Sequence, residues 1–313
     1  MELPVLDMAA LDQGQGIAAL HGACVGAGFF YVANHGIAPP LIEAALHQAR
    51  LFFALPQEQR MAVSLAHSRC NRGYEAMQTQ RLELGMPPDL KEGFYIGNDL
   101  PDDHPRVRAG LFNQGPNQWP AALPGFRPAM EDYFDALTGL AVRLMRAMAA
   151  SLGLAPDHFA GFCDDPMSVL RLLHYPPQPP NPQPGEKGCG AHTDWGCLTL
   201  LWQDAAGGLQ VRVGGEWIDA PPVPGTFVMN IADMFARWTN DRYRSTLHRV
   251  VNVSGRDRYS MPFFFEGNPG HPVTALPGCI PAGEAPRYAP TTVSEHLAGM
   301  YRQTYAAGPP PIM

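Results

Sequence analysis

The stretch CLTLLWQDAAGGLQVRVGGEWID, residues 197–219, decides the fold class of this chain. It holds three short runs that favour strands, at 197–202, 208–213 and 216–219, and turn residues separate them. Short strands with turn signals at intervals of about 8–12 residues are typical of a β-sandwich or β-barrel. The stretch therefore predicts a sheet whose strands are joined by tight turns.

The same pattern extends on both sides, from residue 168 to residue 265, and helices flank it. Residues 128–152 carry apolar side chains at three- and four-residue steps, which predicts a long helix packed on the core. Thr292 and Glu295 fit a capping box at the start of a last helix. Residues 65–125 show no regular pattern. We therefore expect a mainly β protein with flanking helices, of the α+β class, with further strands at 3–6, 28–32, 168–175, 226–231, 246–252 and 259–265, and further helices at 16–24, 40–53 and 56–64.

Composition excludes several classes of protein. Gly and Pro, 32 and 33 residues, make up about a fifth of the 313 residues, which disfavours a long helical bundle. The hydrophobic content of 46% and the net charge of -7 disfavour disorder and nucleic-acid binding. No apolar stretch reaches about 18 residues, and no signal peptide or CxxC pair is visible. We expect a cytoplasmic protein with a small-molecule partner and without a nucleic-acid or membrane partner. The oligomeric state is not indicated.

Three residues suggest a metal site. His192 and Asp194 form the single His-x-Asp triplet of the chain, and residues i and i+2 of a strand face the same side. His248 lies in another predicted strand. Each histidine alone is more simply explained as a hydrogen-bonded core residue. Together, however, two imidazoles and one carboxylate form the facial triad of non-haem Fe(II) oxygenases, which leaves coordination positions open.

A candidate carboxylate receptor follows ten residues after His248. Strand alternation places Arg258 and Ser260 on one face. A guanidinium binds a carboxylate through two hydrogen bonds, and a neighbouring hydroxyl adds a third. The pair is therefore suited to the distal carboxylate of a dicarboxylate such as 2-oxoglutarate.

An ordered set of motifs resembles the 2-oxoglutarate/Fe(II)-dependent dioxygenases, in the branch that includes isopenicillin N synthase. The resemblance covers nearly the whole chain, and its strength lies in the order of the motifs. They are GFFYVANHGI at 28–37, RGY at 72–74, DLKE at 89–92, HYPP at 174–177, HTDWG at 192–196, NIAD at 230–233, WTN at 238–240, HRV at 248–250 and RYS at 258–260.

The resemblance implies a double-stranded β-helix, or jelly roll, as the core of the fold. It implies Fe(II) bound by His192, Asp194 and His248, and 2-oxoglutarate held by Arg258, Ser260 and Tyr175. O2 is the co-reactant and ascorbate a candidate reductant. We divide the chain into an N-terminal mixed helical and strand region (1–125), the oxygenase core with its packing helix (126–290), and a C-terminal helix and tail (291–313).

Substrate residues are harder to place. Arg171 shares a predicted strand face with Tyr175, Trp195 adjoins the metal motif, and Phe94 lies in the irregular segment where a substrate lid is expected. We take these three as candidate substrate contacts, although Arg171 and Trp195 also fit purely structural roles.

The leading hypothesis is an Fe(II) oxygenase that couples oxidative decarboxylation of 2-oxoglutarate to oxidation, chiefly hydroxylation, of a small molecule. One alternative is an oxidase of the isopenicillin N synthase type, in which Arg258 and Ser260 hold the carboxylate of the substrate itself. Another is a non-catalytic jelly-roll protein that binds a metal or metabolite. The Arg258 and Ser260 pair argues against the last, because such a protein needs no dicarboxylate receptor.

Overall fold

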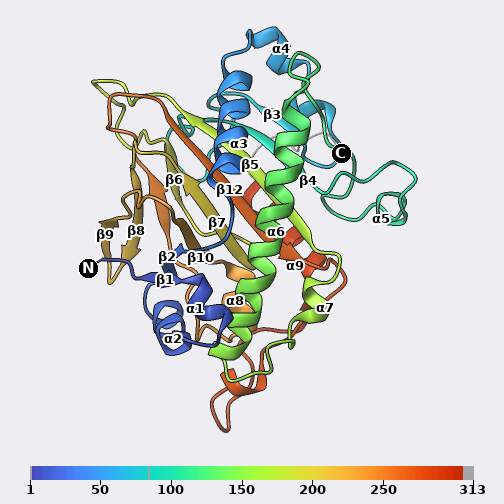
Figure 1. Cartoon of the computed structure of the whole chain (residues 1–313), viewed down its shortest axis with the longest axis vertical. Coiled ribbons are helices and arrows are strands. Elements are labelled where there is room, and N and C mark those ends of the chain that lie inside the picture. Colours follow the sequence, from blue (N-terminus) through green and yellow to red (C-terminus); the bar gives the residue numbers. More distant parts are fainter. Residues whose placement is uncertain (1, 84, 306–313) are drawn as a thin grey trace.

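A computed structural model describes residues 2–83 and 85–305 of the chain. Two sheets form its centre, and helices cover the outer face of the larger one (Figure 1). The larger sheet contains, in spatial order, β1 (Val5–Asp7), β2 (Phe29–Ala33), β10 (Phe227–Ile231), β7 (Leu198–Gln203), β12 (Arg258–Gly267), β5 (Met167–Tyr175), β4 (Glu92–Gly97) and β3 (Gly73–Glu75). The smaller contains β6 (Cys189–His192), β11 (His248–Val250), β8 (Leu209–Val213) and β9 (Glu216–Asp219).

The helices occur where apolar side chains recur at three- and four-residue steps instead of alternating. The longest, α6 (Phe126–Ser151), lies across the larger sheet beside α3 (Pro39–Phe53) (Figure 1). The other helical segments are α1 (Met8–Asp12), α2 (Ile17–Gly26), α4 (Gln57–Met61), η1 (Leu65–His67), α5 (Pro105–Arg108), α7 (Ala160–Cys163), α8 (Asp233–Trp238), η2 (Pro277–Cys279) and α9 (Val293–Tyr305), and β13 (Pro272–Val273) pairs with β14 (Thr291–Thr292).

The apolar stripe of α6 is buried, as its spacing predicts. Met130, Tyr133, Leu137 and Leu144 are each fully buried against the larger sheet and the neighbouring helices. Burial of such side chains contributes about 1.5–3 kcal/mol each to stability. A second apolar cluster, which includes Tyr31, Leu173, Val211 and Val250, lies between the two sheets. The fold is therefore the jelly-roll core with flanking helices that the sequence predicts.

The N-terminus of α9 forms the predicted capping box. The backbone N–H of Thr292 donates to Glu295 Oε2 at 3.0 Å, and the backbone N–H of Glu295 donates to Thr292 Oγ1 at 3.3 Å. This reciprocal pair satisfies two backbone donors that the first helical turn leaves without partners. It fixes where α9 begins, and residues of α9 line a cavity.

The prediction that residues 65–125 are irregular is wrong in part. This segment contributes β3 and β4 to the larger sheet, and β4 is buried along its whole length. A strand buried on both faces lacks polar alternation, so its sequence EGFYIG carries only a weak strand signal. Strand β6 was not predicted either, because its sequence CGAH is too short to show alternation.

Among the described residues, no helix is long and apolar enough to cross a membrane. The predicted divisions after residues 125 and 290 remain predictions.

Candidate metal and cosubstrate site

Three side chains from different parts of the chain converge at one end of the smaller sheet. His192 ends β6, His248 begins β11, and the two residues are paired directly across these strands. Asp194 Oδ1 lies 3.7 Å from Nε2 of His192 and 3.7 Å from Nε2 of His248. The three ligand atoms all lie within 4.8 Å of one another, which is the separation expected around a single metal ion.

Hydrogen bonds on the far side of each ring orient both histidines. Nδ1 of His192 lies 2.8 Å from the carbonyl oxygen of Gly190, and Nδ1 of His248 lies 3.1 Å from that of Thr246. A carbonyl only accepts, so each Nδ1 carries the proton and each Nε2 keeps its lone pair. Burial lowers the pKa of both rings, that of His248 to about 4, so the imidazoles are neutral at pH 7. This is the state that binds a metal ion.

The carboxylate is held in the same way. Oδ2 of Asp194 accepts from Thr199 Oγ1 at 2.6 Å and from Asn230 Nδ2 at 2.8 Å, and Oδ1 is the atom nearest the two rings. Burial opposes ionisation of Asp194, but the histidines and these hydrogen bonds outweigh it and keep its pKa below the ordinary value. The donor set therefore fits Fe(II): two neutral imidazoles and one carboxylate, each already oriented.

The reason for the convergence differs from the sequence argument. Asp194 does not lie in a strand with His192, because β6 ends at His192 and the chain then turns. The backbone N–H of Asp233 donates to the carbonyl of Asp194 at 2.9 Å and fixes this turn beside α8. The triad is thus completed by a loop that α8 holds in place.

A small cavity of about 60 Å³ leads from the triad to Arg258. The guanidinium of Arg258 is fully buried, lies over the ring of Tyr175 at 4.7 Å and donates to Ser260 Oγ at 3.0 Å. Its Nε donates to the carbonyl of Gly207 at 2.6 Å. The predicted receptor residues Arg258, Ser260 and Tyr175 therefore lie together, and all three line the cavity.

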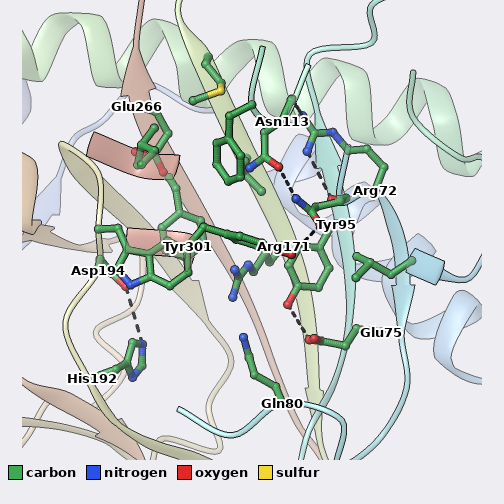
Figure 2. A pocket seen from close by; sticks show the side chains of 18 of the residues that line it. Arg72, Glu75, Gln80, Tyr95, Asn113, Arg171, His192, Asp194, Glu266 and Tyr301 are labelled. Atoms are coloured by element: carbon green, nitrogen blue, oxygen red, sulfur yellow. Dashed lines mark hydrogen bonds and ion pairs between the residues drawn. The ribbon is translucent and has the colours of Figure 1, made fainter. Parts of the chain in front are cut away.

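A second, larger cavity of about 220 Å³ also reaches His192 and Asp194 (Figure 2). Its lining includes the aromatic residues Tyr95, Phe112, Trp195, Phe264 and Tyr301. Arg171 lines both cavities, and its guanidinium lies 4.4 Å from the ring centre of Tyr95 and 5.1 Å from that of Phe264. The remaining lining residues are Leu65, Asn71, Arg72, Glu75, Gln80, Leu82, Asn113, Met167, Val169, Thr193, Glu266 and Leu297.

The three candidate substrate contacts differ in whether they line the larger cavity. Arg171 and Trp195 line the larger cavity. Phe94 does not: its fully buried ring packs on Phe52 and Phe126, on the helix side of the sheet. Because neighbours in a strand face opposite sides, Tyr95 and not Phe94 faces the cavity. Phe94 is therefore corrected to its neighbour Tyr95 as the candidate contact from this strand.

Several residues that line the larger cavity were not predicted from the sequence. Tyr95 donates to Glu75 Oε2 at 2.5 Å, and Tyr301 reaches the cavity from α9. Glu266 is buried, and among the described residues its Oε2 has no hydrogen-bond partner; burial raises its pKa to about 8. Alternation along β12 would have placed Glu266 on the same face as Arg258 and Ser260, so a signal for it existed.

Comparisons with known proteins agree with this geometry. Residues 3–122 match the family described as non-haem dioxygenase in morphine synthesis N-terminal, and residues 166–267 match the 2OG-Fe(II) oxygenase superfamily. The chain belongs to the 2OG-Fe(II) oxygenase superfamily. The predicted family resemblance is confirmed, and with it the need of these enzymes for Fe(II), 2-oxoglutarate and O2.

Relatives of this superfamily resemble the chain over nearly its full length. The 2-oxoglutarate-Fe(II) type oxidoreductase hxnY of Emericella nidulans is 42% identical, covering 96% of this chain and 90% of the relative. Clavatol oxidase claD of Penicillium crustosum is 36% identical, with 97% of each chain covered. The crystal structure of a full-length Neurospora crassa protein in complex with alpha-KG and thymine matches with a TM-score of 0.84 and 32% identity, over 97% of each chain. The chain is therefore a 2-oxoglutarate-dependent oxygenase.

Proposed function

We propose that this oxygenase hydroxylates a small planar aromatic or heteroaromatic molecule that carries an acidic or carbonyl oxygen. The observation that carries the proposal is the position of His192 and Asp194 between two cavities of different character. One cavity ends at a buried guanidinium, and the other includes five aromatic residues in its lining. The first suits a dicarboxylate cosubstrate, and the second suits a flat substrate.

In this proposal His192, Asp194 and His248 would hold Fe(II), which would supply the O2 activation and the oxidative decarboxylation of 2-oxoglutarate to succinate and CO2. Arg258 binds the distal carboxylate through its planar fork, and Ser260 adds a hydroxyl. Tyr175 packs its ring against the guanidinium of Arg258. The buried environment excludes bulk water and strengthens these charge interactions.

The size of the larger cavity, its aromatic residues and the guanidinium of Arg171 support the substrate class. A volume of about 220 Å³ suits a molecule of one or two rings. Tyr95 and Phe264 offer aromatic surface, and Arg171 brings a positive charge to the junction with the metal site. A guanidinium recognises acidic and carbonyl oxygens and also stacks on planar groups. The thymine complex of the Neurospora crassa relative is consistent with such a ligand.

The test is a substrate screen with succinate formation as the readout. The purified enzyme with Fe(II), 2-oxoglutarate and ascorbate is offered planar acids, planar lactams, and aliphatic acids of similar size. We expect planar compounds to stimulate succinate formation and to gain one hydroxyl oxygen. Stimulation by aliphatic acids alone would overturn the substrate class.

A matched pair of variants tests the role of Arg171. Arg171→Gln should raise the substrate KM at least about tenfold, because a charged hydrogen-bonding partner is lost. Arg146→Gln, an exposed arginine of α6, should leave KM unchanged. Equal KM values for the wild type and Arg171→Gln would remove Arg171 from the substrate site.

A further inference from the structure

Lys91 is one of only two lysines in the chain, and its ammonium group is buried beside the metal and cosubstrate residues. Its side chain is 2% exposed, and it lines the small cavity together with Tyr175, Arg258 and His192. It does not line the larger cavity. Any ligand that meets Lys91 is therefore the occupant of the small cavity.

Two neighbours hold the ammonium group in place. Nζ of Lys91 lies 2.6 Å from Asp89 Oδ2 and 3.1 Å from Cys189 Sγ. Asp89 in turn accepts from the backbone N–H of Gly190 at 2.9 Å. Cys189 and Gly190 belong to β6, the strand that ends at His192. Lys91 is thus fixed to the strand that carries a triad residue.

The ammonium retains binding capacity. A lysine ammonium has three N–H donors, and the described residues supply only the two acceptors Asp89 Oδ2 and Cys189 Sγ. Burial lowers the pKa of Lys91, but Cys189 and Asp89 raise it by more, so the amine stays protonated. A buried ion pair by itself is a weak source of stability, because the cost of desolvation offsets the attraction. Stability alone therefore does not explain this pair.

We propose that Lys91 is a second cation of the cosubstrate site, which donates its remaining N–H to an oxygen of 2-oxoglutarate while Asp89 and Cys189 position it. The inference rests on the proposed placement of the cosubstrate between the triad and Arg258. In this arrangement the dianionic cosubstrate meets positive charge from two separate segments of the chain. Arg258 comes from β12, and Lys91 comes from the residue before β4.

The experiment is an anaerobic titration of the Fe(II) enzyme with 2-oxoglutarate, followed by the visible charge-transfer band of the complex. Lys91→Met removes the charge and keeps most of the side-chain volume. We expect its Kd for 2-oxoglutarate to rise about ten- to a hundredfold, the usual effect of losing a charged hydrogen bond. The Fe(II) affinity, measured before the cosubstrate is added, should stay within about twofold.

Two further variants separate binding from packing. Lys91→Met leaves Asp89 buried without its partner, so the double variant Asp89→Asn, Lys91→Met removes both charges together. We expect the double variant to bind 2-oxoglutarate as weakly as Lys91→Met. Lys187→Met removes the other lysine, which pairs with Glu83 at 2.8 Å outside both cavities, and should leave the Kd unchanged.

The outcomes are distinct. Recovery of wild-type affinity in the double variant would show that Lys91 only neutralises Asp89, and would overturn the proposal. Wild-type affinity in both variants would also overturn it. If Arg258→Gln also left the Kd unchanged, the proposed placement of the cosubstrate would fail as well. If Lys91→Met did not fold, the double variant, which buries no unpaired charge, would decide the question.

Discussion

His192 and His248 face each other as direct partners across β6 and β11, with ring centres 4.3 Å apart. Each ring is oriented by a carbonyl of its own segment, so the separation is set by the backbone pairing of the two strands. Asp194, from the loop after β6, completes the set. The metal site is therefore built on the register of the smaller sheet.

The triad gives the first prediction. His248→Ala should lower the Fe(II) affinity at least about tenfold, because one of three protein ligands is lost. The protein should also fail to develop a visible band with 2-oxoglutarate under anaerobic conditions. His158→Ala, an exposed histidine, serves as the control and should bind iron normally. Undiminished iron binding by His248→Ala would exclude it as a ligand.

Arg258 gives a graded prediction. Arg258→Gln should raise the Kd for 2-oxoglutarate about a hundredfold, because a buried charged receptor is removed. Arg258→Lys keeps the charge but loses the planar fork, so its Kd should fall between those of the wild type and Arg258→Gln. Anaerobic titration measures all three. The idea fails if Arg258→Gln binds as tightly as the wild type.

The alternation along β4 predicts opposite effects at neighbouring positions. Phe94→Ala should lower the free energy of unfolding by about 3–5 kcal/mol, because it leaves a cavity in the aromatic core. Tyr95→Phe removes the hydroxyl that donates to Glu75 and keeps the ring, so it should change substrate KM with little effect on unfolding. Urea denaturation and steady-state kinetics measure the two effects. A selective change of KM in a stable Phe94→Ala would reverse the assignment.

Gly196 is predicted to tolerate no side chain. A Cβ at this position would overlap the carboxyl group of Glu266. Gly196→Ala should therefore lower the melting temperature, with a cost of about 1–3 kcal/mol for the overpacking. Adding Glu266→Ala should restore most of the loss. If the second substitution gave no rescue, another contact of Gly196 would be responsible.

Glu266 also predicts a pH dependence of stability. Its pKa is raised to about 8 by burial, above the ordinary value of 4.5. An acid with a higher pKa in the folded state binds its proton more tightly there, so stability falls as the pH rises from 4.5 to 8. Glu266→Gln removes this dependence. In the metal-free protein, the melting temperature of the variant relative to wild type should rise between about pH 5 and 8 and then level off.

Much of the fold could be predicted because turns and apolar periods mark it. The strand predictions around β5, β7, β8, β9, β10 and β12, and the buried stripe of α6, needed no tertiary information. β4 and β6 could not be found in this way. The first is buried on both faces and shows no alternation, and the second is only four residues long. Both are defined by their partner strands more than by their own sequence.

The same contrast holds for the site: residues within motifs could be predicted from the sequence, and residues brought together from separate segments could not. The order of the motifs predicted the triad and the Arg258 and Ser260 pair, and the structure brings these residues together. The wall of the larger cavity comes from separate segments, which include β4, the loop near Asn113 and α9. No spacing links Tyr95 to Tyr301, because their proximity exists only after folding.

Arg171 touches both cavities, and this has a thermodynamic consequence. In the proposed function, one guanidinium therefore contributes to the electrostatic free energy of two different ligands. If the binding of one ligand alters its position or hydration, the affinity for the other must change, and the factor is the same in both directions. The Kd of 2-oxoglutarate with saturating substrate, and that of substrate with saturating 2-oxoglutarate, thus form a closed cycle. In Arg171→Gln this coupling factor should move towards one, because one of the side chains that line both cavities has lost its charge.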